Sequence, residues 1–426
     1  MRISSVKKIS GSVRVPGDKS ISHRAVILGS LAKGLTEIGN LSPCEDCMRT
    51  VTAFKNMGIE FSFSKESVTI KGKGLSGLSE PHDVLDLGNS GTSIRLLAGV
   101  LSAQPFFSVL TGDRYLLKRP MDRIIVPLAQ MGAKITGRGN NRFAPLAIKG
   151  EKLNPISYSM PIPSAQVKSS VILAGIFVEG TTRITETAQT RDHTEIMLRS
   201  FGGKISKAGG TIAVEGGQYL EGTDIFVPSD ISSAAFFLVA ASLLKDSSVT
   251  IKDVGINPTR TGILDILKQM GAKIELSNVC AKNGEPVADI SASTSELHAI
   301  SIGEEIAPRA IDEFPIIFIA AALAKGTTHI TGIKELRVKE SDRIATMVKG
   351  LKDMGIKVTE GEGEVTIEGS DKFRGAEINS FGDHRVAMSF SVAALLADSE
   401  TSIDDVKCID TSFPGFFNIL EKIVKK

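Results

Sequence analysis

A short segment, in most copies Met-Gly followed by a small or apolar residue and Lys, recurs along this chain of 426 residues. A glycine just after a helix readily adopts the left-handed conformation that ends it, so each copy predicts a helix end and a strand start. The copies follow one another after 74, 70, 69 and 84 residues, at Met57–Ile59, Met131–Lys134, Phe201–Lys204, Met270–Lys273 and Met354–Lys357. The chain is therefore expected to repeat one supersecondary unit.

A second, more apolar helix of small residues is predicted upstream of each copy, followed by a short strand rich in Thr or Ser. These helices are expected at 25–31, 95–101, 169–177, 234–244, 314–324 and 386–396. The last unit ends on Phe416, Ile419, Leu420 and Ile423, which have the spacing of one helix face. We count six units of helix, strand, helix and strand, which are too long for the common solenoids.

Six units of this length divide most simply into two α/β domains of three units each. The hinge is expected near 227–229, and the N-terminal strand is expected to cross over and complete the second domain. The predicted domains are residues 15–228 and a discontinuous domain of 1–14 plus 229–426. A cleft between two similar domains is a preferred place for a ligand site, and domain closure can expel water from it.

Composition excludes several functional classes. The 50 Lys and Arg nearly balance the 48 Asp and Glu, which argues against a large basic face for nucleic acid. No Trp is present and aromatic residues make up 5%, too few for a base-stacking platform. No apolar run approaches the roughly 20 residues of a membrane span, and no signal peptide is evident. We expect a cytoplasmic protein without membrane or nucleic-acid partners.

Polar motifs lie at the predicted starts of the apolar helices in the first three units. Lys19, Ser20 and Arg24 stand at the first such start, where the helix dipole prefers anions. A bound phosphate or carboxylate would explain these cations, and a solvated helix end is the alternative. A glycine-rich turn containing Gly91 could bind an anion through its backbone amides. Ser164 is a plausible helix cap, whereas the residues after it add polarity that capping does not require.

The last two units carry acidic and mixed motifs at the same places. Asp312 and Glu313 precede an apolar helix, which the helix dipole alone would favour. Residues 337–343 pack three cations and two carboxylates ahead of an amphipathic helix, and such a run is usually a solvated face. His384 is the best-placed group to titrate near neutral pH. We expect these positions to meet in one cleft, with the cations Lys19, Arg24, Arg119, Lys168, Arg191, Lys339, Arg343 and Arg385 around a multiply charged ligand.

The four cysteines do not indicate a metal or redox site. Cys44 and Cys47 form one close pair, but Cys280 and Cys408 are too widely separated to complete a zinc site. A thioredoxin-like context is also missing. We interpret them as structural thiols and expect no metal and no cofactor.

The motifs in their order resemble those of the 5-enolpyruvylshikimate-3-phosphate (EPSP) synthases, the 3-phosphoshikimate 1-carboxyvinyltransferases, over essentially the whole chain. The matching segments are PGDKSISHR (16–24), GNSGTSIRLL (88–97), KRPM (118–121), PSAQVKSS (163–170), IDEFP (311–315), RVKESDR (337–343) and GDHRVAM (382–388). The resemblance implies a two-domain inside-out α/β barrel of three repeats per domain, with the active site in the interdomain cleft. This agrees with the six units counted from the repeat.

The resemblance also implies an activity of aromatic amino acid biosynthesis in the shikimate pathway. The carboxyvinyl group of phosphoenolpyruvate would pass to the 5-hydroxyl of shikimate 3-phosphate through a tetrahedral intermediate, with loss of phosphate. Shikimate 3-phosphate would bind Lys19, Ser20, Arg24, Ser164, Ala165, Gln166, Arg191, Asp312 and Lys339. Phosphoenolpyruvate would bind Lys19, Gly91, Arg119, Gln166, Arg343 and Arg385. We assign Asp312 as base and Glu340 as acid, assisted by Lys19 and His384, in a monomer.

The chain departs from part of the family. Some members carry a Lys before a Thr-Phe-Pro-like segment near the C-terminus, whereas residues 410–414 contain none. Arg191 stands where some members use Ser and Tyr, a pattern that resembles the second class of the family. Tolerant members of that class often have a larger residue at the position of Gly91, so we expect glyphosate to inhibit this protein.

Two other functions fit parts of the pattern. A UDP-N-acetylglucosamine carboxyvinyltransferase shares this fold and chemistry. Its N-terminal motif, however, has Lys-Asn where this chain has Asp18-Lys19-Ser20. It also carries a reactive Cys on a mobile loop, and the corresponding residues 116–121 contain no Cys. A non-catalytic repeat protein could use two lobes as a clamp, but it would not need Lys19, Asp312 and Glu340 together.

Overall fold

The structure is a computed structural model that describes residues 1–425, and by contacts the chain forms two compact units. Unit 1 consists of Met1–Pro16, Pro228–Ala281 and the chain from Pro286 onward. Unit 2 consists of Gly17–Val227 and Lys282–Glu285. The domain boundaries given above remain a prediction, because compactness does not show which segments fold or move together.

Unit 2 contains three four-stranded sheets with the same connectivity. In each, a short edge strand is parallel to its neighbour and the other pairs are antiparallel. The first sheet has the order β14 (Ile225–Phe226), β3 (Lys33–Gly39), β5 (Ser67–Lys73), β4 (Glu60–Phe63). The second is β6 (Leu85–Asp86), β7 (Phe107–Thr111), β9 (Phe143–Lys149), β8 (Lys134–Gly137), and the third β10 (Ser157–Ser159), β11 (Thr181–Thr185), β13 (Thr211–Glu215), β12 (Ile205–Ala208).

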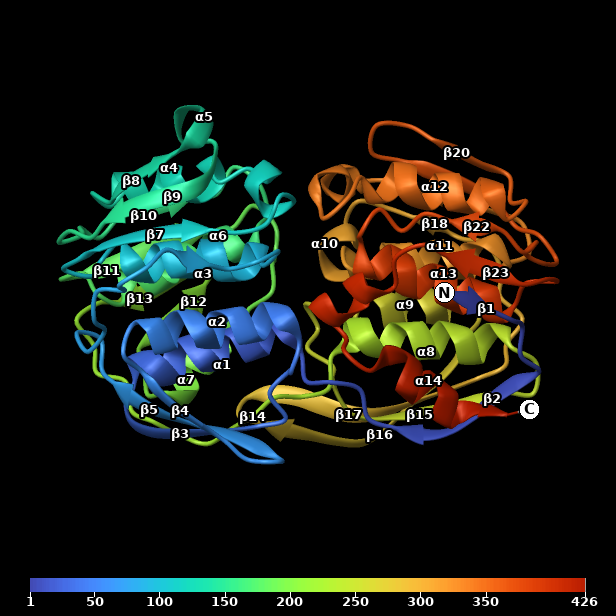
Figure 1. Cartoon of the computed structure of the whole chain (residues 1–426), viewed down its shortest axis with the longest axis horizontal. Helices are drawn as coiled ribbons and strands as arrows, with labels where there is room; N and C mark the ends of the chain where they lie inside the picture. The colour runs from blue at the N-terminus through green and yellow to red at the C-terminus, as the bar shows by residue number, and fades with distance from the viewer. Residues whose placement is uncertain (426) are drawn as a thin grey trace. The chain divides into compact units, whose positions relative to one another are not determined.

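The buried helices of unit 2 lie between these sheets (Figure 1). The most buried are α1 (Lys19–Leu31), α3 (Gly91–Leu101) and α6 (Ala165–Gly175), and α3 contacts both of the others. A helix buried on all sides needs small and apolar residues all round, which is the composition that the sequence shows. The remaining helices are α2 (Glu45–Asn56), η1 (Leu116–Lys118), α4 (Asp122–Gln130), α5 (Arg138–Asn141) and α7 (His193–Ser200).

Unit 1 also contains three sheets. Two have the orders β16 (Lys273–Lys282), β17 (Glu285–Ser293), β15 (Ser248–Gly255), β2 (Lys8–Val13), β24 (Val424–Lys425) and β18 (Ser301–Ile302), β19 (Thr327–Ile330), β21 (Val365–Glu368), β20 (Val358–Glu360). The third is β1 (Arg2–Ile3), β23 (Thr401–Ile403), β22 (Glu377–Ile378). Both N-terminal strands therefore pair with strands of the last three repeats.

Three buried helices of unit 1 contact one another, namely α8 (Ile231–Leu243), α11 (Phe314–Ala322) and α13 (His384–Leu395). The others are α9 (Gly262–Gln269), α10 (Ala307–Ala310), η2 (Lys334–Val338), α12 (Arg343–Asp353), η3 (Lys407–Thr411) and α14 (Phe416–Ile423). None of the helices in residues 1–425 combines the length and apolar character that a membrane crossing requires.

The recurring glycine ends a helix in every copy, as predicted. The φ angles are 85° at Gly58, 98° at Gly132, 80° at Gly202, 97° at Gly271 and 84° at Gly355. A side chain is disfavoured at such angles, which explains why glycine occupies each position.

One sequence prediction was wrong in detail. The repeat contains more elements than the predicted helix, strand, helix and strand, because hairpins such as β8 and β9 follow the second helix and a short edge strand precedes the first. The polar motif was expected at the start of the first helix, ahead of its apolar part at 25–31, and α1 begins at Lys19. The polar motif forms the first turn, since the Asp18 carboxylate accepts a hydrogen bond from the Ile21 amide at 2.8 Å.

Candidate active site

The predicted residues of unit 2 lie at the first turns of its buried helices. Lys19 and Ala165 are the first residues of α1 and α6, and Gly91 is the first residue of α3. Ser164 caps α6 as predicted, accepting a hydrogen bond from the Val167 amide at 3.4 Å. Short side chains and backbone amides at three helix starts suit an anionic ligand.

Arg24 is buried with a guanidinium bound by neutral oxygens. Its Nε donates to Thr194 Oγ1 at 2.6 Å, Nη1 to the Ser20 carbonyl at 2.8 Å and Nη2 to Ser169 Oγ at 2.7 Å. Burial lowers the pKa of Arg24 to about 10, although the carboxylates of Glu195 and Asp18 oppose this. The guanidinium remains charged at neutral pH, and its hydrogen-bond partners carry no negative charge. This arrangement favours an added anion.

Arg191 precedes α7 and lies close enough to Arg24 to repel it electrostatically. Two neighbouring guanidinium groups destabilise each other unless an anion lies between them or beside them. Arg24 and Arg191 therefore form one cationic group, as the predicted role for both residues requires.

A second cationic group surrounds the start of α3. Arg119 Nη2 donates to Asn89 Oδ1. Arg95 Nη1 donates to Gln166 Oε1 at 2.5 Å, and Gln166 Nε2 donates to Thr92 Oγ1 at 3.0 Å. The predicted residues Arg119 and Gln166 thus both contact residues at the start of α3, Arg119 through Asn89 and Gln166 through Thr92.

A side chain at Gly91 would displace the neighbouring guanidinium groups. A Cβ atom at this position would lie 2.8 Å from Arg119 Nη1 and 3.1 Å from Arg95 Nη1. Sequence reasoning missed Arg95 as a site residue, although an arginine inside an otherwise apolar helix was a usable signal.

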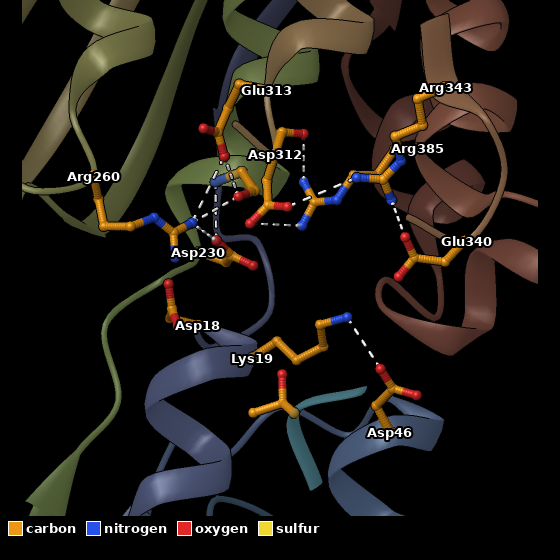
Figure 2. A network of polar contacts seen from close by, with 12 residues as sticks. Asp18, Lys19, Asp46, Asp230, Arg260, Asp312, Glu313, Glu340, Arg343 and Arg385 are labelled. Atoms are coloured by element: carbon orange, nitrogen blue, oxygen red, sulfur yellow. Dashed lines mark hydrogen bonds and ion pairs between the residues drawn. The ribbon is translucent and has the colours of Figure 1, made fainter. Parts of the chain in front are cut away.

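Lys19 forms an ion pair with Asp46, with Nζ 3.1 Å from Oδ2. Both side chains are largely buried, at 14% and 7% exposure. Asp46 comes from α2 and was not predicted. The pair fixes the lysine ammonium at the start of α1 (Figure 2).

In unit 1, Arg343 is surrounded by carboxylates. Its Nε donates to Asp383 Oδ2 at 2.8 Å and Nη2 donates to Glu340 Oε2 at 2.7 Å. Asp312 Oδ1 lies 3.7 Å from Nη1. Burial would lower the pKa of Arg343, but Asp383 and Glu340 outweigh it and raise this pKa above its ordinary value.

Arg385 contacts the same acidic group from the first turn of α13. Its Nη1 donates to the Asp312 carbonyl at 2.9 Å, and Nη2 lies 3.9 Å from Asp312 Oδ2. Figure 2 shows Arg343 and Arg385 directed toward Asp312 and Glu340. The predicted base and the predicted acid therefore share the Arg343 guanidinium, and Arg385 contacts the base as well.

Asp383 and its neighbours complete the network. Asp383 is fully buried, caps α13 through the Arg385 amide at 2.9 Å and accepts from Ser341 Oγ at 3.1 Å. Burial opposes its ionisation, but Arg343 holds the pKa of Asp383 below its ordinary value. His384 is buried beside it. Asp383 was missed, because a carboxylate at a helix cap has a purely structural explanation.

Lys339 lies in the same part of unit 1. Burial lowers the pKa of its ammonium group, with Asp312 opposing this effect. A desolvated ammonium gains from a bound anion, so Lys339 suits its predicted role.

A further buried network in unit 1 was not predicted. Arg260 Nη2 donates to Ser232 Oγ at 2.7 Å and lies 3.4 Å from Asp230 and 3.7 Å from Glu313. Asp230 caps α8 in the way that Asp18 caps α1. The repeat of a capping aspartate was the available signal.

Lys168 was expected among the ligand-binding cations, and this was wrong. Its side chain has no exposed surface and pairs with Glu186 at 3.0 Å and Glu195 at 2.7 Å. Because the two carboxylates are themselves only 2% exposed, the whole ion-paired group of Lys168 is closed off from a ligand. Within residues 1–425, no group of three or more His, Cys, Asp or Glu is placed to hold a metal ion.

Comparisons with known proteins agree on one family. The sequence model of EPSP synthase (3-phosphoshikimate 1-carboxyvinyltransferase) matches residues 3–420. A 3-phosphoshikimate 1-carboxyvinyltransferase of Citrifermentans bemidjiense is 53% identical, with 99% of this chain and 98% of that protein aligned. One of Brevibacillus brevis is 51% identical, with 99% of each chain aligned.

Solved structures give the same result. The EPSP synthase structure from Acinetobacter baumannii matches with a TM-score of 0.88 and 48% identity, covering 99% of this chain and 97% of that one. The enolpyruvyl transferase NikO from Streptomyces tendae matches with a TM-score of 0.82 at 18% identity, covering 99% and 96%. The second likeness shows a common fold only.

Proposed function

The chain belongs to the EPSP synthase family, and from this premise we propose that it transfers the carboxyvinyl group of phosphoenolpyruvate to the 5-hydroxyl of shikimate 3-phosphate. The observation that carries the proposal is that the carboxylates of Glu340 and Asp312 both lie within ion-pair distance of the Arg343 guanidinium. It supplies two carboxylates for proton transfer, and binding alone would not need both. The full-length match to carboxyvinyltransferases supports the same reaction.

We propose that the Arg24 group holds shikimate 3-phosphate. Arg24 and Arg191 supply charge for the 3-phosphate, and Ser20, Ser164, Ala165 and Gln166 are at helix starts that can hydrogen-bond to it. Arginine is suited to phosphate because its planar fork can donate two parallel hydrogen bonds. Lys339 and Asp312 are proposed to contact the same substrate from unit 1.

Phosphoenolpyruvate is proposed to bind the remaining cations. Lys19, Arg119, Arg343 and Arg385 would meet its phosphate and carboxylate, with Gly91 and Gln166 beside them. Cations that are fixed before the reaction stabilise the charge that develops on the leaving phosphate.

The proposed reaction begins with addition. Glu340 gives a proton to the methylene carbon of phosphoenolpyruvate, and the adjacent carbon becomes oxocarbenium-like. The 5-hydroxyl attacks that carbon while Asp312 takes its proton, which forms the tetrahedral ketal.

Elimination then reverses the roles. Glu340 removes a proton from the new methyl group, the C–O bond to phosphate breaks, and the carbon–carbon double bond re-forms. Lys19 and His384 are proposed to assist by stabilising charge near the transferred protons. The same carboxylate acts as acid and then as base, so its position matters more than its average protonation state.

We further propose that the protein acts as a cytoplasmic monomer without nucleic-acid partners and without a metal or cofactor. The near-balanced charge of +2 supports the absence of a nucleic-acid role. Two small anionic substrates account for the buried cations described above.

A phosphate-release assay tests the activity. We expect release only when phosphoenolpyruvate and shikimate 3-phosphate are both present. UDP-N-acetylglucosamine serves as the control acceptor, and turnover with it instead would favour the other carboxyvinyltransferase. Binding of both substrates without any release would favour a clamp and contradict the proposal.

A further inference from the structure

The turn between β16 and β17 carries a buried acid that contacts the helix next to Arg24. Residues Lys282–Glu285 belong to unit 2 by contacts, whereas the chain on either side belongs to unit 1. The turn is formed by Asn283 and Gly284, with φ of 50° and 78°, as in the tight hairpin turns that Asn-Gly favours. Glu285 follows directly, so the turn geometry sets its place.

The turn is held against unit 2 by several contacts. Asn283 Oδ1 accepts from the Phe226 amide at 2.8 Å, and Nδ2 donates to the Asp224 carbonyl at 2.8 Å. The Asn283 carbonyl accepts from Ser200 Oγ at 3.1 Å. Lys282 Nζ lies 3.8 Å from the centre of the Phe226 ring. A turn fixed in this way can hold a side chain accurately.

Glu285 uses this position to bind His193. Its Oε1 lies 2.7 Å from His193 Nδ1, and the two side chains are 5% and 2% exposed. His193 is the first residue of α7, and the Asp192 side chain makes no capping hydrogen bond there. The first residue of α7 is therefore held by a buried side-chain contact with Glu285.

The first turn of α7 is also what orients Arg24. Thr194 follows His193 and accepts from Arg24 Nε at 2.6 Å. Thr194 Oγ1 and Ser169 Oγ are 2.7 Å apart, and both contact the guanidinium. Arg191 lies two residues before His193. A shift of this turn would move Thr194 and Arg191 together.

We propose that Glu285 is a positioning residue for the phosphate-binding group of Arg24 and Arg191, acting through His193. The proposal rests on the proposed function for the identity of the ligand, shikimate 3-phosphate. Glu285 itself contacts neither substrate. Its carboxylate fixes the imidazole, the imidazole fixes the first turn of α7, and that turn fixes the two arginines.

The test compares Glu285→Ala with Glu285→Gln, which can still accept a hydrogen bond from the imidazole. We expect Glu285→Ala to raise KM for shikimate 3-phosphate about tenfold, since small displacements of positioning groups have large effects. KM for phosphoenolpyruvate and kcat are expected to stay within about twofold, because the reacting groups are untouched. Glu285→Gln is expected to restore most of the affinity.

Glu215→Ala is the matched control. Glu215 also belongs to unit 2 and pairs with a cation, Lys204, at 3.6 Å, but both side chains are exposed. A merely structural role of Glu285 would make Glu285→Ala less stable without a selective change in KM, and Glu215→Ala is expected to change neither stability nor KM. Equal effects of Glu215→Ala and Glu285→Ala on KM, or no effect of Glu285→Ala, would overturn the proposal.

Hydrogen exchange separates this proposal from the proposed function. Amides of 191–200 are expected to exchange faster in Glu285→Ala than in the wild-type protein, with or without turnover. Unchanged exchange there would overturn the positioning role even in an active enzyme. Wild-type protein without carboxyvinyl transfer would overturn the proposed function. Faster exchange of the amides of 191–200 in Glu285→Ala would still support the role of Glu285 in fixing the first turn of α7. If Glu285→Ala does not fold, Glu285→Asp shortens the side chain, withdraws the carboxylate from His193 and is expected to raise the same KM.

Discussion

Arg24 and Arg343 are both buried arginines, but their surroundings are opposite. Arg24 donates to two hydroxyls and a carbonyl, and burial lowers its pKa to about 10. Arg343 donates to the carboxylates of Asp383 and Glu340, which raise its pKa despite burial. The first arginine has only neutral hydrogen-bond partners, whereas the second organises the acids around it in addition to its proposed role in binding phosphoenolpyruvate. The difference teaches that burial alone does not identify a ligand-binding cation.

Lys168 extends the comparison within unit 2. Two carboxylates compensate its charge, so it resembles Arg343 rather than Arg24. Its sequence context had suggested a ligand role. It differs from Arg343 in the exposure of those carboxylates, because Glu186 and Glu195 are 2% exposed whereas Asp312 and Glu340 are 17% and 15% exposed.

The largest effect is expected from Glu340→Gln. This change removes the transferable proton but keeps a hydrogen-bond acceptor for Arg343, so kcat should fall about 10²–10⁴-fold. Glu360→Gln is the control, because Glu360 also pairs with an arginine, Arg337, at 2.8 Å. Steady-state phosphate release measures both. A kcat for Glu340→Gln within threefold of wild type would contradict the acid role.

Asp383→Asn tests the compensation of Arg343. Breaking a buried pair leaves the guanidinium less compensated, and the free energy of unfolding is expected to fall by about 3–5 kcal/mol at neutral pH. The measurement is urea unfolding from pH 7 to pH 3.

The pH dependence of this variant has a definite sign. The pKa of Asp383 is lower in the folded protein than its ordinary value of 3.8. The contribution of the Asp383 carboxylate to the free energy of unfolding is therefore fully present above about pH 3.8. It is lost as the pH falls through the lower pKa that Asp383 has in the folded protein. The stability difference between wild type and Asp383→Asn should narrow below pH 4. A constant difference at all pH values would contradict this account.

Gly91→Ala tests a third arginine, Arg119. The added methyl would lie 2.8 Å from Arg119 Nη1, so this guanidinium must move. We expect KM for phosphoenolpyruvate to rise about tenfold and glyphosate to inhibit less strongly than it inhibits the wild type. Gly39→Ala is the control, because the atom nearest to the added methyl would be 3.7 Å away. In this variant, KM for phosphoenolpyruvate and the inhibition by glyphosate should both stay at their wild-type values. Wild-type activity that persists at millimolar glyphosate and low phosphoenolpyruvate would contradict the inhibition.

The smallest expected effect is the change in thermal stability caused by Arg24→Met. The lowered pKa means that burial disfavours the charged form, so removing the charge relieves a cost of folding. We expect Tm without substrate to stay within a few degrees of wild type or to rise. Arg343→Met is the comparison and should lower Tm clearly, because it leaves Asp383 and Glu340 uncompensated. Equal decreases of Tm in Arg24→Met and Arg343→Met would contradict the distinction between the two arginines.

Much of the fold was predictable because the recurring glycines and apolar helices are local signals. Gly58, Gly132 and Gly355 end helices where the repeat predicted. The short edge strands were not predictable, since strands such as β6 and β14 have two residues each and form only by pairing.

The site was predictable as a set of motifs but not as a network. Arg119 and Gln166 were found through their segments, and Arg95 was missed because a residue inside an apolar helix reads as part of the core. Glu285 had no sequence signal at all. It lies 92 positions from His193, and only the folded chain brings the two together.

Calorimetric titration of shikimate 3-phosphate into Arg24→Met and Glu340→Gln tests the central claim most directly. Loss of a charged hydrogen-bonding group is expected to weaken binding by Arg24→Met about 10- to 100-fold. Glu340→Gln is expected to bind the same ligand with a Kd within about threefold of wild type, although it does not turn over. Full affinity in Arg24→Met together with lost affinity in Glu340→Gln would contradict the account.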